Sequence, residues 1–260
     1  HLLFRKEGVN WMGNAPPFTF HAMGDHVLNL KFADDLSIEI NERVQRLKQK
    51  LEQLNVIGIE EMIPTMNTLS IIYDPMVIDY SHLEEYIRKI DIAATERQIE
   101  EKTVIHIPVT FSDDYAPDMR WILSQTGLTK NAFIDILTER EYYVYMIGFI
   151  AAGPYMGDTP EQIRFPRRSV PRVKVRKGTV SIATKMTNIY TVDSPGGWHL
   201  VGWTPMDMFD YKRNPPSPLK SGYYVKYDPI SQTMAEKWSK TIQNEWDKKW
   251  HQSDVSNPAY

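Results

Sequence analysis

The chain contains no cysteine among its 260 residues. This absence excludes disulfide bonds, thiolate metal ligands and a cysteine nucleophile. Three glycine-based signatures are also missing: GxGxxG and GxxxxGK[ST], which cradle phosphates, and GxSxG, which presents a nucleophilic serine. The sequence therefore predicts no nucleotide bound through such loops, and it identifies no catalytic residue.

Charge and hydropathy narrow the class further. The net charge of −3 offers no basic field for nucleic acid, and no apolar run is long enough to span a bilayer. The first residues, HLLFRKEGVN, lack the apolar segment and cleavage site of a secretory signal. We therefore expect a cytoplasmic protein without nucleic-acid or membrane partners. Only His21 and His26 lie near each other, at a spacing that matches no familiar site, so no metal is expected.

The first part of the chain reads as a small α/β unit. Residues 1–17 end in two prolines and are expected to form a loose arm, and the charged residues 95–102 a linker. In between we expect strand 26–32, helix 37–54 with Ser37 as N-cap, strands 59–64 and 68–73, and helix 81–90 opened by a capping box at Ser81. This order is most of a ferredoxin-like unit.

The second part is rich in short strands. Strand 103–111 and two short helices, 117–125 and 129–140, precede them. From Tyr142 onward, turn signals separate many short apolar segments, which is typical of a barrel or sandwich. The stretch 231–250 is expected to be one helix.

Two segments here attract attention as binding candidates. Pro195-Gly196-Gly197-Trp198 favours a tight turn, with close approach of a ligand or backbone as the alternative. Arg167 and Arg172 each stand beside a proline in a basic segment and are candidates to hold a carboxylate, carbonate or phosphate. The neighbouring stretch from Lys174 to Lys177 reads mainly as an edge strand with one solvated face.

The last helix carries an aromatic face. Its apolar residues recur every fourth position, and packing on the protein's own barrel is the favoured interpretation. The alternative is an interface with another protein chain, because tryptophan is enriched at binding hot spots. The interface candidates are Trp238, Ile242, Trp246 and Trp250.

Several stretches together resemble one family. They are LSIIYDP (69–75), YVYMIGF (143–149), FPRRSVPRVKVRKGTVSIA (165–183) and IYTVDSPGGWHLVGWTPMDMFD (189–210). Over about residues 20–231 the chain resembles the family of KipI, the B component of 5-oxoprolinase (PxpB) and allophanate hydrolase subunit 1. The resemblance implies an α+β fold with a ferredoxin-like α/β domain at 18–100 and a cyclophilin-like β-barrel at 101–230. The expected C-terminal helix and tail at 231–260 follow this region, and the helix is longer than the usual ending of family members.

The resemblance also implies partners. Family members pair with a homologous protein of the C type or KipA type, and with a large A-type component they form an ATP-dependent 5-oxoprolinase. Related domains form the carboxyltransferase part of urea carboxylase, which adds a biotin-carrying component. ATP and biotin would thus belong to the complex, and this chain itself is expected to bind no cofactor. KipI itself inhibits a sporulation histidine kinase.

The chain departs from the family pattern at several positions, and three of them usually carry functional side chains. Leu137, Met186 and Trp203 stand where the family usually has a histidine, a glutamine and an arginine. Those groups suit proton transfer, amide orientation and oxyanion binding. Lys185 is a hypothetical replacement charge. The departures indicate a changed substrate rather than 5-oxoproline itself.

Three functions follow from the resemblance. The first is a subunit of a lactam- or amide-processing complex of the 5-oxoprolinase or carboxyltransferase type, not active alone. Its small amide or carboxylated substrate would contact Arg167, Arg172, Lys185 and His199, between walls formed by Tyr145 and Trp198. The second is a non-catalytic regulator like KipI, and the third is a structural subunit of a larger carboxylase assembly.

Overall fold

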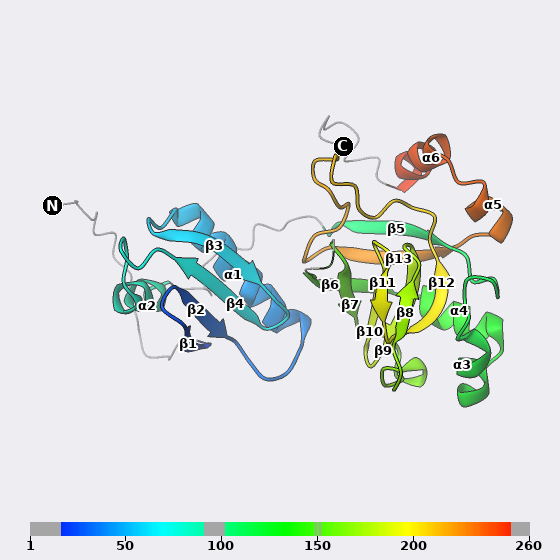
Figure 1. Ribbon diagram of the computed structural model, residues 1–260, viewed down its shortest axis with the longest axis horizontal. Helices are drawn as coiled ribbons and strands as arrows, with labels where there is room; N and C mark the ends of the chain where they lie inside the picture. The colour runs from blue at the N-terminus through cyan, green and yellow to red at the C-terminus, as the bar shows by residue number, and fades with distance from the viewer. Residues whose placement is uncertain (1–16, 91–101, 149, 151, 251–260) are drawn as a thin grey trace. The chain divides into compact units, whose positions relative to one another are not determined.

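The computed structural model describes residues 17–90, 102–148, 150 and 152–250 (Figure 1). The chain divides into two compact units, residues 1–100 and 101–260. The expected N-terminal arm and the expected linker lie outside the described residues, apart from residues 17 and 102. No helix in the described ranges combines the length and apolarity needed to cross a membrane.

The first unit is a four-stranded antiparallel sheet with two helices. The strand order is β1-β2-β4-β3. The elements are β1 (Thr19–Met23), β2 (Val27–Lys31), α1 (Ile38–Leu54), β3 (Ile59–Pro64), β4 (Thr68–Tyr73) and α2 (Tyr80–Arg88). Strand β1 was not expected from the sequence. Strand β1 forms a hairpin with β2 and is an edge strand of the sheet.

The core of this unit follows from the sequence periodicities. Leu28, Leu30, Leu69 and Ile71 alternate along β2 and β4 and are fully buried. They share one apolar cluster with the buried stripe of α1 and with residues of α2. Ser37 caps α1 as predicted, because its side chain accepts a hydrogen bond from the Ile40 amide. The predicted N-cap of the second helix, Ser81, is wrong by two residues.

Asp79, not Ser81, begins that second helix. Its carboxylate accepts a hydrogen bond from the His82 amide at 2.9 Å. A carboxylate at the helix N-terminus satisfies a free amide and also interacts favourably with the helix dipole. The capping-box pattern at Ser81 therefore lay inside the helix rather than at its start.

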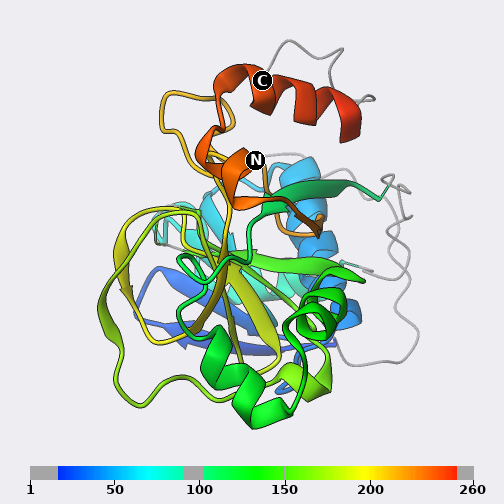
Figure 2. The same cartoon turned by 90° about the vertical axis from the view of Figure 1, so that its right-hand side faces the viewer.

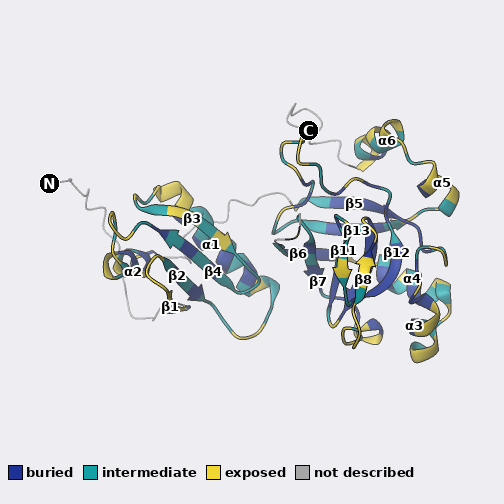
Figure 3. Ribbon diagram, viewed as in Figure 1, coloured by how far each residue is buried: buried dark blue, intermediate teal, exposed yellow. Residues whose placement is uncertain are grey.

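The second unit is a seven-stranded sheet that curls into a nearly closed barrel. Its order is β12-β9-β10-β7-β6-β13-β5, and all pairs are antiparallel except β13 with β5. The strands are β5 (Val104–Val109), β6 (Glu141–Ile147), β7 (Pro154–Gly157), β9 (Thr179–Ala183), β10 (Met186–Ile189), β12 (His199–Trp203) and β13 (Tyr224–Pro229). A separate two-stranded ribbon pairs β8 (Arg172–Val175) with β11 (Ser194–Gly196) and is largely exposed (Figure 3).

Two backbone hydrogen bonds close the barrel between the first and last strands of this order. The Thr110 amide donates to the Trp203 carbonyl at 2.8 Å, and the Trp203 amide donates to the Thr110 carbonyl at 2.9 Å. Gly202 makes this approach feasible. A Cβ atom there would lie 2.8 Å from Val109 Cγ1 and 3.0 Å from the Thr110 carbonyl oxygen.

Helices cover two opposite sides of the barrel (Figure 2). On one side lie α3 (Met119–Thr126) and α4 (Lys130–Thr138), joined through Gly127 in a left-handed conformation. They contribute buried residues, among them Ile122 and Phe133, to the same apolar cluster as the strands. The short 3₁₀ helix η1 (Glu161–Ile163) adds Ile163 to it.

The C-terminal segment is two helices rather than the one predicted. They are α5 (Gln232–Glu236) and α6 (Lys240–Trp250). The break has a local cause, because the Ser239 hydroxyl accepts a hydrogen bond from the Ile242 amide and so starts a new helix.

The aromatic face of α6 packs on its own barrel, at strand β5. Trp246 is buried, and its indole N–H donates to the His106 carbonyl at 2.8 Å. The Trp250 ring stacks on the His106 ring at 3.9 Å, and Trp238 packs edge-on against Trp246. Three of the four interface candidates, the tryptophans, thus have partners within this unit. The fourth, Ile242, is half-buried.

We expect Gly202→Ala to destabilise the second unit by about 2 kcal/mol, because overpacking a close contact typically costs this much. Thermal and urea unfolding measure the effect. The matched control is Gly127→Ala, where a Cβ atom meets nothing within 4 Å and only the φ of +69° is unfavourable. A Gly202→Ala variant no less stable than this control would contradict the closure argument.

Candidate functional site

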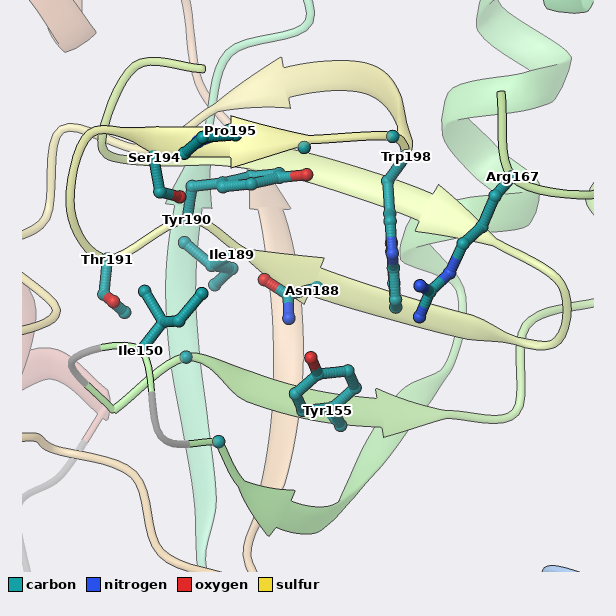
Figure 4. A pocket seen from close by; sticks show the side chains of 14 residues that line it. Ile150, Tyr155, Arg167, Asn188, Ile189, Tyr190, Thr191, Ser194, Pro195 and Trp198 are labelled. Atoms are coloured by element: carbon teal, nitrogen blue, oxygen red, sulfur yellow. The ribbon is translucent and has the colours of Figure 1, made fainter. Parts of the chain in front are cut away.

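A pocket of about 180 Å³ opens in the second unit beside the Pro-Gly-Gly-Trp stretch (Figure 4). Three parts of the chain form it: the connection between β6 and β7 together with Tyr155 of β7, the end of β10 with the residues after it, and the segment from β11 to β12. Arg167 adds a side chain from the loop before β8. The lining residues are Gly148, Ile150, Gly153, Tyr155, Arg167, Asn188, Ile189, Tyr190, Thr191, Ser194, Pro195, Gly196, Gly197 and Trp198.

Gly196 is required by a close contact rather than by a turn angle. It lies in β11, paired with Arg172 of β8, and neither it nor Gly197 has a positive φ. A Cβ atom at Gly196 would lie 1.9 Å from the Tyr190 hydroxyl oxygen. The favoured tight-turn interpretation is therefore wrong for Gly196, since what approaches the glycine is the side chain that lines the pocket.

The polar groups of the pocket are a cation and neutral donors or acceptors. Among the described lining residues there is no acid, and the Arg167 guanidinium has no ion pair within the described part of the chain. It lies 5.6 Å from the centre of the Trp198 ring, within cation–π range. Burial raises the pKa of Tyr190, partly offset by a backbone hydrogen bond with Trp198, so the phenol is neutral near pH 7.

The walls are aromatic. The Tyr155 and Trp198 rings meet edge to face at 6.0 Å. Tyr190 forms a further side, with Asn188 between it and Tyr155 (Figure 4). Flat apolar walls with one cation suit a small planar ligand that carries negative charge.

A buried carboxylate holds the loops next to the pocket. Asp118, only 4% exposed, accepts hydrogen bonds from Arg172 at 2.7 Å and Arg168 at 3.1 Å through Oδ1. Its Oδ2 accepts from the Leu200 amide at 2.7 Å. The Arg168 amide in turn donates to the Gly197 carbonyl at 2.7 Å. Asp118 therefore ties the start of α3 to the loop of Arg167 and to β12.

This arrangement separates the arginines that the sequence could not tell apart. Arg172, a predicted binding residue, is engaged with Asp118 and does not line the pocket, whereas Arg167 does. The sequence singled out Arg172 because it stands beside a proline. It did not reveal that a carboxylate 54 positions earlier takes up this charge.

His199, a predicted binding residue, is not among the residues that line the pocket. Its Nε2–H donates to the Pro166 carbonyl at 2.9 Å, since a carbonyl oxygen can only accept. The ring stacks on Trp121 at 4.7 Å. Nδ1 is buried and has no hydrogen-bond partner among the described residues. Through its Nε2 hydrogen bond, His199 supports the loop at Pro166.

Tyr145 and Lys185 also lie outside the pocket lining. Tyr145 is buried, and its hydroxyl donates to Asp158 Oδ1 at 3.3 Å. Burial, and next to it the nearby Asp158 carboxylate, raise the pKa of Tyr145. Lys185 lies in the two-residue turn that joins β9 to β10, and its carbonyl accepts from the Thr159 amide.

The three positions that depart from the family pattern are taken up by packing. Leu137 is fully buried in the barrel core, and Met186 pairs with Ala183 and Gly157. The Trp203 indole donates to the Lys177 carbonyl and stacks on Tyr115. Within the described part of the chain, none of the three lines the pocket.

Comparison with known proteins places the chain in a family. The model of the carboxyltransferase domain, subdomain C and D, matches residues 18–219. The chain belongs to this family. It is 30% identical to the B component of the Bacillus subtilis 5-oxoprolinase over 227 residues, 83% of this chain and 94% of that protein.

Solved structures agree with the fold. The crystal structure of TTHA0988 is 27% identical, with a TM-score of 0.70 over 79% of this chain. This chain spans only 40% of that longer one. The urea amidolyase of Kluyveromyces lactis has 18% identity and a TM-score of 0.65 over 98% of this chain, which spans 18% of that protein. This last likeness concerns the fold alone, an α+β fold with a barrel-like sheet and C-terminal helices.

Sequence analysis missed Tyr155, Asn188 and Tyr190 as pocket residues. One of them had a usable signal, because asparagine is disfavoured in strands and Asn188 lies in an otherwise buried one. The two tyrosines had no such signal, since a tyrosine in a strand usually packs in a core. No group of three or more metal-ligating side chains occurs in the described ranges.

We expect Asp118→Ala to destabilise the second unit by about 3 kcal/mol, because removing one partner leaves two guanidinium groups without their buried carboxylate. Urea unfolding of the second unit provides the measurement. The control is Asp193→Ala: this exposed carboxylate pairs with Lys174 and the Lys177 amide, and its loss should destabilise the unit far less, because water screens an exposed ion pair. Equal losses in the two variants would show that Asp118 has no special role.

Proposed function

We propose that this chain is a subunit of an ATP-dependent complex of the 5-oxoprolinase type and that its pocket binds a small acidic amide. The observation that carries the proposal is the pocket itself: Arg167 without an ion pair among the described residues, no acidic lining residue, and walls of Tyr155 and Trp198. Family membership supports the assignment, as does the nearly full-length match to the B component of the Bacillus subtilis 5-oxoprolinase.

The size and charge of the pocket narrow the ligand class. A volume of about 180 Å³ lies below the roughly 300–1,000 Å³ of pockets for drug-sized ligands. It is close to the roughly 150 Å³ of a cavity that holds benzene. A substituted five- or six-membered ring therefore fits, and a nucleotide does not. A carboxylate is the natural partner of the arginine, because guanidinium groups bind it through two parallel hydrogen bonds.

The ATP of such a complex would then be bound by another protein, the large A-type component. A homologous C-type protein would complete the site on this one, with a biotin-carrying component added in a carboxylase-type assembly. This chain would bind and orient the ligand but would not turn it over alone. The alternative functions are a regulator of a histidine kinase and a structural part of a carboxylase, and the composition of the native complex distinguishes them.

Purification of the tagged chain from its native cells tests the assembly. We expect a stoichiometric C-type partner in the eluate, identified by mass spectrometry, together with a large ATP-using protein. A biotinylated partner would instead assign the chain to a carboxylase. Recovery of a histidine kinase, or of the chain by itself, would contradict the proposal and favour a regulatory function.

Titration calorimetry of the purified chain with 5-oxoproline tests the pocket. This ligand is chosen although the departures from the family pattern indicated a changed substrate, because Leu137, Met186 and Trp203 do not line the pocket. We expect Arg167→Gln to weaken binding by about 10- to 100-fold, because a hydrogen bond to a charged group contributes about 1.5–3 kcal/mol. The matched control is Arg164→Gln, since Arg164 donates to the Thr159 carbonyl and is not among the residues that line the pocket. The same loss in both variants, or none in Arg167→Gln, would exclude Arg167 as the anion contact.

A further inference from the structure

Asn188 is a polar side chain at the centre of the pocket with no structural partner among the described residues. It lies in β10 between the buried residues Thr187 and Ile189, and it is itself half-buried. No hydrogen bond to its carboxamide occurs within the described ranges, although its backbone carbonyl accepts from Ser181 at 3.4 Å. Figure 4 shows this side chain between Tyr155 and Tyr190, with Trp198 and Arg167 to one side.

No contact within the described residues explains a polar side chain at this position. The carboxamide is half-buried and makes no hydrogen bond to them. Asparagine is also unfavourable in a strand, so neither packing nor propensity accounts for it. A ligand with matching polar groups would pair with its donors and acceptor, whereas an apolar ligand would cover them and leave them unpaired.

We propose that Asn188 is the specificity-determining residue of the pocket and that it selects the amide group of the ligand. A carboxamide presents one acceptor and two donors side by side. An amide whose N–H and C=O lie on the same side, as in a lactam, offers the complementary pair. The Tyr155 hydroxyl, which also lacks a hydrogen-bond partner among the described residues, is a further donor beside it.

The two ends of the ligand are thereby assigned to different side chains. Arg167 binds the acidic group, and Asn188 distinguishes an amide from an apolar ring of the same size. The inference rests on the proposed function, because it assumes that an acidic amide occupies the pocket. It adds that Asn188 is the discriminating residue and that it discriminates against apolar rings of the same size.

The test compares two ligands in the full chain by titration calorimetry. 5-Oxoproline carries both the carboxylate and the lactam, and cyclopentanecarboxylate carries the carboxylate on a ring of the same size without the amide. We expect the unchanged protein to prefer 5-oxoproline by about 10- to 100-fold, because a site with buried polar groups rejects a ligand that leaves them unpaired.

In Asn188→Leu, a substitution of similar volume, this preference should fall to about threefold or less. The loss should come from weaker binding of 5-oxoproline, with cyclopentanecarboxylate bound about as well as before. The matched control is Asn29→Leu, a half-buried strand asparagine of the first unit, which should keep the full preference. Asn188→Ala serves as a second variant if the leucine variant does not fold.

The failing outcomes are distinct. Equal binding of the two ligands by the unchanged protein, or an undiminished preference in both Asn188 variants, overturns the role of Asn188 while the acidic pocket stands. Binding of neither ligand overturns the proposed ligand class, and this inference with it. If both ligands bind to Arg167→Gln as tightly as to the unchanged protein, the proposed orientation of the ligand is overturned.

Discussion

The Asp118 carboxylate is the contact on which the geometry of the candidate site depends. One oxygen binds two arginines and the other binds the amide of Leu200, so three separate segments meet at one buried group. The backbone of Arg168 then holds the Gly197 carbonyl, and Gly197 is part of the pocket wall. Arg167 is not part of this cluster, and its side chain lines the pocket.

Barrel closure provides the frame for this contact. The Thr110–Trp203 bridge brings the end of β12 against the end of β5, and Asp118 follows shortly after β5 in the chain. Gly202 has no Cβ at the point of closest approach, as Gly196 has none beside the Tyr190 hydroxyl. Two glycines in one short stretch therefore have different structural reasons: one permits closure of the sheet, and the other admits a pocket side chain.

The three positions that depart from the family pattern do not line this pocket, although the side chains that the family usually has there would suit catalysis. Leu137 lies in the core, Met186 in a strand pair, and Trp203 in an aromatic stack with Tyr115. The pocket is lined instead by Arg167, Asn188 and aromatic side chains. Of these, sequence analysis had named Arg167 and Trp198, both within the motif-bearing stretches.

The sequence by itself determined the class of fold, most element positions and the family, because periodicity, caps and motifs are local properties of the chain. It predicted α1 with its cap at Ser37 and the short strands of the barrel. Only the tertiary structure decided which arginine lines the pocket, why Gly196 is a glycine, and that Asn188 lies in the same pocket. Each of these depends on a contact between side chains from separate parts of the chain, and no local pattern records which residues such contacts will join.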